Sequence, residues 1–221
     1  MLRIVVALEA EARPLIARFQ MTPLDGITAF RVYRHATTAD ATDGEWLIVS
    51  GLGKAAAAAA TSFLHLCSGG REDCVWLNVG IAGHDRLDLG SAVVADRVTD
   101  QATGRTWRTA LPVPSPCPTA PLLTVDKVQE EYSLPVVYEM EAAGFVATAR
   151  RFSTADLVHC FKVISDRPGS PLAMAAEGSP RLATVFVEEL IATTLPDLQR
   201  FAGRLVKLAR RRTAGDAVAE D

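Results

Sequence analysis

The chain has 221 residues, of which 49% are hydrophobic, and its 23 basic and 26 acidic side chains give a formal net charge of −3. This composition predicts one globular domain with a full-sized core, and the lack of a basic excess argues against a nucleic-acid partner. No apolar run approaches the roughly 20 residues that a membrane-spanning helix needs, and the N-terminus lacks the features of a secretory signal. We therefore expect a cytoplasmic protein without a membrane span.

The cysteines show neither CxxC pairing nor the histidine spacing of a zinc site; they are Cys67, Cys74, Cys117 and Cys160. In a reducing compartment such residues are buried thiols rather than disulfides or metal ligands. We expect no bound metal and no cofactor.

The first half of the chain alternates between predicted strands and helices. The predicted strands cover residues 2–8, 28–33, 45–50, 74–79 and 91–98, and the predicted helices cover 9–19 and 54–67. Apolar strands that alternate with helices are typical of an α/β protein with a buried parallel sheet.

The second half begins with a break in this pattern. Residues 101–124 hold five prolines and show weak periodicity, so we predict a long surface excursion that covers a pocket. Ser179 and Pro180 form an N-cap and first-turn proline pair, which predicts a helix start. The remaining predictions are a short helix at 126–132, strands around 136 and 163, helices at 142–151, 181–194 and 196–212, and a disordered tail at 213–221.

Three predicted strands end in acidic side chains. The strand at 2–8 is followed by Glu9 and Glu11, the strand around 136 by Glu139 and Glu141, and the strand around 163 by Asp166. Because parallel strands deliver the residues at their carboxyl ends to one rim of a sheet, we expect these carboxylates to share one ligand pocket. Taken singly, each acid also fits a helix cap or a surface carboxylate, and Asp166 has Arg167 as a possible ion-pair partner.

Two glycine-rich segments join the predicted elements. SGLGK at 50–54 lacks the spacing of a Walker or dinucleotide motif, so we interpret its glycines as allowing tight packing between a strand and a helix. NVGIAGH at 78–84 is predicted to be a turn where a ligand approaches the backbone closely, and it is the better pocket candidate.

Six short motifs, in this order, resemble the nucleoside phosphorylase superfamily. They are ALEAE at 7–11, SGLGK at 50–54, NVGIAG at 78–83, LGSAVVAD at 89–96, EMEAA at 139–143 and ISD at 164–166. The opening is most similar to the methylthioadenosine/S-adenosylhomocysteine nucleosidase branch. The resemblance implies a single α/β domain over residues 1–212: a three-layer sandwich with a central mixed, mostly parallel sheet flanked by helices. It also implies a homodimer or larger homo-oligomer, for which the helix at 55–67 is the candidate interface.

The resemblance implies a role for each acid. Glu11, with Glu9 as a neighbouring competitor, corresponds to the residue that activates the attacking water, and Asp166 to the one that protonates the departing purine at N7. Glu141 corresponds to the carboxylate that holds the ribose hydroxyls. Cleavage of an N-glycosidic bond needs an anionic group beside the sugar and a proton donor beside the base, and these acids supply both. The other residues implied in substrate binding are Ile81, Ala82, Gly83, Glu139, Met140 and Ser165.

Two departures from the family pattern leave alternatives open. Ile81 stands where nucleosidases often have a small hydroxyl residue, and the base-binding segment is reduced to LTVDKV at 123–128. Residues 78–84 lack a phosphate clamp, so the sequence favours a hydrolase acting on a purine nucleoside or a nucleoside-derived metabolite. The alternatives are a phosphorylase that binds phosphate through Arg13, Arg31 or Lys54, and a member that binds a nucleoside-like small molecule without cleaving it.

Overall fold

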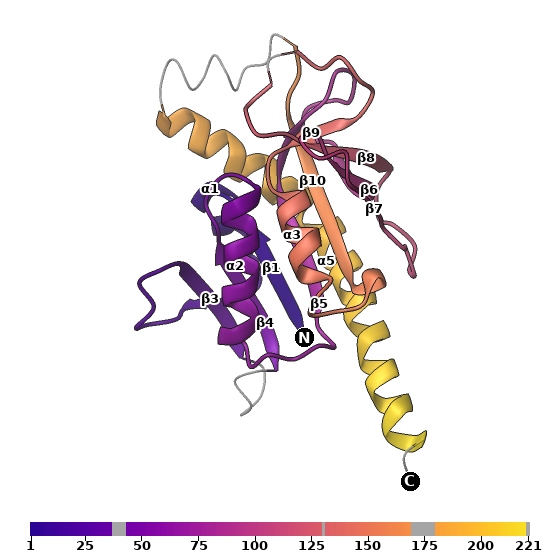
Figure 1. The fold of residues 1–221 in the computed structure, drawn as a ribbon. Helices are drawn as coiled ribbons and strands as arrows, with labels where there is room; N and C mark the ends of the chain where they lie inside the picture. Colours follow the sequence, from indigo (N-terminus) through magenta and orange to yellow (C-terminus); the bar gives the residue numbers. More distant parts are fainter. Residues whose placement is uncertain (37–42, 130, 169–179, 220–221) are drawn as a thin grey trace.

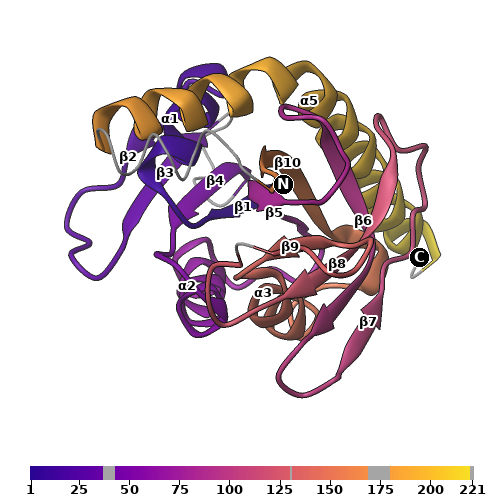
Figure 2. The same ribbon diagram turned by 90° about the horizontal axis from the view of Figure 1, so that it is seen from above.

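A mixed sheet runs through the molecule, with helices over both of its faces (Figures 1 and 2). The computed structural model describes residues 1–221 except 37–42, 130, 169–179 and 220–221. The strands are β1 (Leu2–Val6), β2 (Thr22–Pro23), β3 (Arg31–Ala36), β4 (Gly44–Val49), β5 (Val75–Gly83), β6 (Ala92–Asp100), β7 (Thr106–Arg108), β8 (Thr119–Thr124), β9 (Val137–Glu139) and β10 (Val158–Asp166). The helices are α1 (Glu9–Arg18), α2 (Lys54–Cys67), α3 (Ala142–Ala149) and α5 (Pro180–Ala219), with a 3₁₀ turn at Ala155–Leu157.

The centre of the sheet is parallel. Strands β4, β1, β5 and β10 lie side by side in this order and run in the same direction. Each residue of β1 is buried, as expected for an apolar strand that is covered on both faces. Antiparallel pairs flank this centre: β3 with β4, and β6 with β10. The carboxyl ends of the parallel strands therefore meet at one edge of the sheet.

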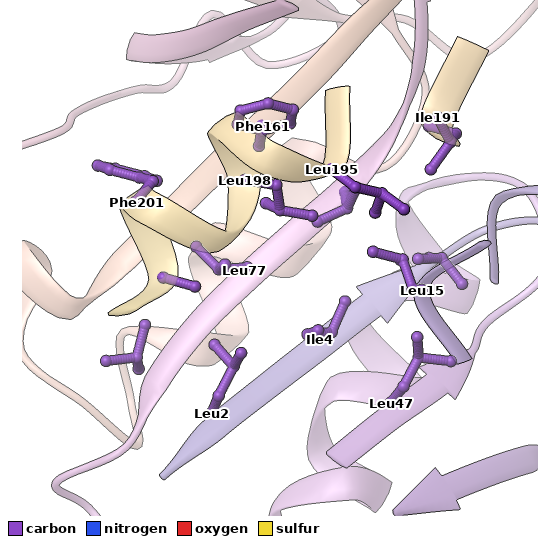
Figure 3. Close-up of a cluster of buried hydrophobic side chains, with 14 of the residues drawn as sticks. Leu2, Ile4, Leu15, Leu47, Leu77, Phe161, Ile191, Leu195, Leu198 and Phe201 are labelled. Carbon is purple, nitrogen blue, oxygen red and sulfur yellow. The ribbon is translucent and has the colours of Figure 1, made fainter. Parts of the chain in front are cut away.

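Two apolar cores lie on opposite faces of the sheet. Helices α1 and α5 cover one core, which Figure 3 shows with Ile4 and Leu77 of the sheet against Leu198 and Phe201 of α5. Helices α2 and α3 cover the other core, where Trp76 and Phe145 are fully buried. Figure 2 shows the two helix pairs on either side of the strands. Among the described helices, none combines the length and apolar character that a bilayer span requires.

Several predicted elements are confirmed, and α2 has the predicted bounds of 54–67. The strand predicted at 28–33 begins later, at Arg31. The segment 78–84 is not a turn up to Gly83, because β5 continues to that residue. Its glycines serve the strand by leaving room for side chains that pack on it: a Cβ on Gly80 would lie 2.8 Å from Oε1 of Glu11.

The second half of the chain differs more from the prediction. The excursion at 101–124 contains β7 and β8, and β8 joins the sheet between β6 and β9. The helix predicted at 126–132 is wrong for the described residues there, which have no regular structure.

The two helices predicted at the end are one continuous helix, α5. Pro196 lies inside it, and the buried Leu195 and Leu198 on either side pack on the sheet, which outweighs the lost backbone hydrogen bond. The helix continues to Ala219, past its predicted end at residue 212, and so includes part of the segment 213–221 that was predicted to be a tail. Ser179, the predicted N-cap, lies outside the described residues.

Candidate active site

Glu11 is buried in the first turn of α1, with its carboxylate turned toward β5. Its Oε2 accepts hydrogen bonds from the backbone N–H groups of Ala7 and Leu8, and its Oε1 accepts one from Ile81, all at 2.8 to 2.9 Å. Burial raises the pKa of Glu11, while the charge of Lys162 and these backbone donors partly offset the rise. The side chain is therefore fixed at the carboxyl edge of β1 and β5.

Glu9, the competing acid, occupies a different position. Its Oε1 lies 2.6 Å from Nη1 of Arg31 on β3, and its side chain is 25% exposed. The two acids of this turn thus face different strands. Only Glu11 contacts the NVGIAG segment of β5, which the sequence analysis selected as the pocket candidate.

Glu139 ends β9 and fixes the start of α3. Its Oε2 accepts hydrogen bonds from the backbone N–H groups of Glu141 and Ala142 at 2.9 and 2.8 Å. Its Oε1 accepts a hydrogen bond from the hydroxyl of Thr124, which in turn accepts one from the N–H of Ala143. A carboxylate at a helix N-terminus stabilises the helix through both the free N–H groups and the dipole. Glu139 therefore holds the strand-to-helix junction together.

Glu141 follows at the N-cap of α3 and is 6% exposed. Its Oε1 accepts a hydrogen bond from the backbone N–H of Gly53 at 2.9 Å, and its Oε2 lies 3.9 Å from Nζ of Lys162. Burial raises the pKa of Glu141, the charge of Lys162 lowers it, and the charge of Glu139 raises it further. The glycine turn after β4 therefore receives a carboxylate of the protein, which agrees with its interpretation as a packing turn.

Lys162 is the charged centre of this site, and the sequence analysis did not select it. It lies on β10 with 1% of its surface exposed, and its Nζ is 3.0 Å from Oε2 of Glu139. Burial lowers the pKa of Lys162, but the negative charges of Glu139, Glu141 and Glu11 raise it well above its ordinary value. A lysine within the apolar run at 160–164 could have indicated this site, because a buried ammonium group requires acidic partners.

Asp166 ends the same strand, four residues after Lys162. Its Oδ2 accepts a hydrogen bond from the hydroxyl of the fully buried Ser165 at 2.7 Å. The Ser165 hydroxyl also lies 3.4 Å from the carbonyl oxygen of Ala82 on β5. Gly83 is the register partner of Asp166. Ser165 thus orients the Asp166 carboxyl group beside the end of β5.

The remaining predicted residues lie along the same edge. Ile81 and Ala82 contribute backbone groups, and Met140 is half-buried between the two glutamates of EMEAA. Tyr132, which the sequence analysis did not select, lies with its phenol against Gly83. The structure therefore brings the predicted residues of β5, β9, α3 and β10 to one edge of the sheet.

The cations proposed for phosphate binding all face carboxylates. Arg13 lies 2.6 Å from Glu188, and Arg31 pairs with Glu9 as described above. Lys54 lies 2.8 Å from Asp100 and 2.9 Å from Asp126. Each of these charges is neutralised within the protein, so none is a ready phosphate ligand.

A pocket of about 460 Å³ lies away from the acidic cluster, beside β3 and the end of β4. Residues 23–24, 27–33, 49 and 50 line it; these include Arg31, a candidate for phosphate binding, but not the predicted catalytic residues Glu11 and Asp166. In the part of the chain that the structure describes, no three His, Cys, Asp or Glu side chains are arranged to hold a metal ion.

Comparison with known proteins identifies the fold. No family model matches the chain, and no curated protein sequence matches it. A 5'-methylthioadenosine/S-adenosylhomocysteine nucleosidase from Helicobacter pylori, solved with butyl-thio-DADMe-Immucillin-A, superposes with a TM-score of 0.71 at 14% identity, covering 92% of this chain and 97% of the other.

Two further solved structures are similar to the same extent. The futalosine hydrolase of Helicobacter pylori gives a TM-score of 0.70 at 14% identity over 92% of this chain and 97% of its own. The 5'-methylthioadenosine nucleosidase of Arabidopsis thaliana gives 0.68 at 14% identity over 94% and 95%. These likenesses show that the chain shares the mixed α/β fold of these nucleosidases and of the futalosine hydrolase.

Proposed function

We propose that this chain, which shares its fold with nucleosidases of the nucleoside phosphorylase superfamily, hydrolyses the N-glycosidic bond of a purine nucleoside or a nucleoside-derived metabolite. One observation carries the proposal. The carboxylates of Glu11 and Glu141 both lie in the field of the buried Lys162, and Asp166 ends the strand that holds this lysine. In this proposal the sugar, as its positive charge grows, lies beside the first two carboxylates, and the departing base lies beside the third.

In this mechanism each of the three acids has a separate role. Glu11 accepts a proton from the attacking water, and Glu141 binds the ribose hydroxyls, with Met140 against the sugar. Asp166, oriented by Ser165, delivers a proton to the base at N7 as the bond to the sugar breaks. A raised pKa keeps Glu11 close to the range where it can take up a proton, which suits a general base.

The other predicted residues support this arrangement. The backbone of Ile81, Ala82 and Gly83 lies along this edge of β5, and the missing side chains at positions 80 and 83 leave room for Glu11 and Tyr132. Glu139 neutralises Lys162 at 3.0 Å, closer than Glu141 at 3.9 Å. We therefore assign Glu139 to the positioning of Glu141 rather than to direct contact with the substrate.

We favour water over phosphate as the nucleophile. Phosphorolysis needs cationic groups that bind phosphate, and Arg13, Arg31 and Lys54 are each paired with an acid.

Binding of a nucleoside without cleavage is the remaining candidate function. The altered base segment is the reason to consider it, because Val128 of that segment is 78% exposed rather than packed in the protein.

The substitution Asp166→Asn tests the function. The amide keeps the shape of the side chain but has no carboxylic proton to give, so we expect base release to fall by about 100-fold or more. The measurement is free-base release from a panel of purine nucleosides by wild type and variant, with thermal unfolding to show an unchanged fold. Equal rates would remove Asp166 from the mechanism, and nucleoside binding without turnover by the wild type would favour the binding protein.

We also propose the three-layer form of the fold, a cytoplasmic location and a homo-oligomer. The free thiols of the four cysteines suit a reducing compartment. The outer side of α2 carries exposed apolar residues, among them Ala59 and Leu66, the latter 75% exposed. Burial of this side between two copies would explain an apolar surface on a charged protein.

A further inference from the structure

The phenol of Tyr132 lies directly on the backbone of β5. A Cβ built on Gly83 would lie 2.3 Å from the Tyr132 hydroxyl oxygen and 2.5 Å from Cε1 and Cζ of the ring. No side chain larger than hydrogen fits at position 83 while Tyr132 holds this place. Because Gly83 is the register partner of Asp166 on β10, the hydroxyl end of Tyr132 lies beside the proposed proton donor.

Neighbouring residues hold Tyr132 in this position. Its ring lies 5.2 Å from the ring of Tyr138, centroid to centroid, with an interplanar angle of 57°. The Tyr138 hydroxyl accepts a hydrogen bond from the backbone N–H of Leu134 at 3.0 Å, which ties the segment after Tyr132 to β9. Tyr138 also forms the register pair between β9 and β5, with Gly83 as its partner. The phenol is thus anchored over the end of β5 by contacts on two sides.

The chemistry of this group is that of a hydrogen-bond donor. Burial raises the pKa of Tyr132 to about 12, and the negative charge of Asp166 contributes to the rise. The hydroxyl therefore keeps its proton throughout the physiological range. A phenol can donate to a lone pair on a heterocycle without giving up its proton.

We propose that Tyr132 is a second hydrogen-bonding group for the departing base, next to Asp166. This inference rests on the proposed function and extends it. When the C–N bond breaks, its electron pair passes to the base, which takes a proton from Asp166. Water forms the new bond to the sugar carbon and gives its proton to Glu11. The O–H of Tyr132 stays intact and donates to a lone pair of the base, so it stabilises the charge that develops there.

The substitution Tyr132→Phe removes this donor and keeps the ring on Gly83. We expect free purine bases, with hypoxanthine and adenine as probes, to bind about tenfold more weakly to the variant in calorimetric titration, which is the effect of one hydrogen bond. We expect kcat/KM for nucleoside hydrolysis to fall by at least as much. Tyr33→Phe is the matched control, because it removes a hydroxyl from β3, away from Asp166, and should leave both quantities unchanged.

The two readouts separate this inference from the proposed function. Weaker base binding by Tyr132→Phe, in a protein that hydrolyses no nucleoside, would support the Tyr132 contact and reject the hydrolase. Hydrolysis by the wild type, with equal base affinity and equal kcat/KM in Tyr132→Phe, would reject the Tyr132 contact alone. If neither base binds the wild type, or if Tyr33→Phe loses as much affinity as Tyr132→Phe, the inference is overturned.

Discussion

The site contains more negative than positive charge. Glu11, Glu139 and Glu141 act on one ammonium group, that of Lys162, and all four side chains are buried. Lys162 lies closest to Glu139, whose oxygens also receive two backbone N–H groups. Glu141 lies farther from the ammonium group, at 3.9 Å, and one positive charge does not balance three carboxylates. An excess of negative charge in a site of low dielectric suits a reaction in which the sugar becomes positive.

Lys162→Met should destabilise the protein strongly. The side chains have similar length, but the variant leaves the Glu139 carboxylate buried without its cation, which costs about 3–5 kcal/mol in comparable buried pairs. Urea denaturation measures the loss. Arg71→Met is the control, because Arg71 pairs with Asp73 near the surface, with its side chain 38% exposed, and should lose less than about 1 kcal/mol. Equal losses in the two variants would show that Lys162 is not the centre of a buried network.

The acidic limb of the pH profile should report Glu11. A general base must be ionised to act, and burial raises the pKa of Glu11 above its ordinary value of 4.5. Activity should therefore rise with pH through a midpoint above 4.5. The measurement is kcat/KM against pH for wild type and Glu11→Gln, and the variant should lose this limb together with most of its activity. A limb that survives in Glu11→Gln with the same midpoint would assign the titration to another group.

At the scale of elements, the site depends on how closely α2 and α3 approach each other. A Cβ on Gly144 of α3 would lie 1.9 Å from the carbonyl oxygen of Lys54 at the start of α2. The same junction brings the N–H of Gly53 to the carboxylate of Glu141. The glycine therefore sets the distance between two elements that both contribute to the site.

Gly144→Ala should destabilise the protein, because the contact is with backbone and can be relieved only by a shift of the helix. Overpacking of this kind costs about 1–3 kcal/mol. Gly203→Ala in α5 is the matched control: a Cβ there meets nothing within 4 Å, so helix propensity should stabilise it by up to about 1 kcal/mol. Urea midpoints of the two variants should move in opposite directions. A shift of the same sign would indicate that α2 and α3 pack more loosely than described.

The elements of this fold differ in how much of their structure the local sequence predicts. Apolar strands such as β1 and the alanine-rich α2 were predicted well, because their local pattern and their buried environment agree. The end of β5 was not, since glycines usually mark turns. Here the absence of a side chain at Gly80 and Gly83 leaves room for Glu11 and Tyr132. Such contacts between distant residues leave no pattern in the local sequence.

The same distinction applies to the site as a whole. The acidic residues could be selected because each lies at or just after the end of a strand. The parallel strands β1 and β10 bring Glu11 and Asp166 to one edge as predicted, whereas β9 reaches the end of β5 as an antiparallel neighbour. Lys162 and Tyr132 could not be selected in this way. The first lies inside a strand, and the second lies in a segment between β8 and β9 that has no regular structure in its described residues. Their positions follow from the folding of the complete sheet.

For the whole molecule, the central claim is that water attacks the sugar carbon of a bound nucleoside. The direct measurement is mass spectrometry of the sugar product after turnover in water enriched in heavy oxygen, with phosphate present. The account predicts a free sugar that carries one heavy oxygen, together with one equivalent of free base. A sugar phosphate without the heavy label would show phosphorolysis, and the absence of any cleavage across the nucleoside panel would contradict the enzymatic role.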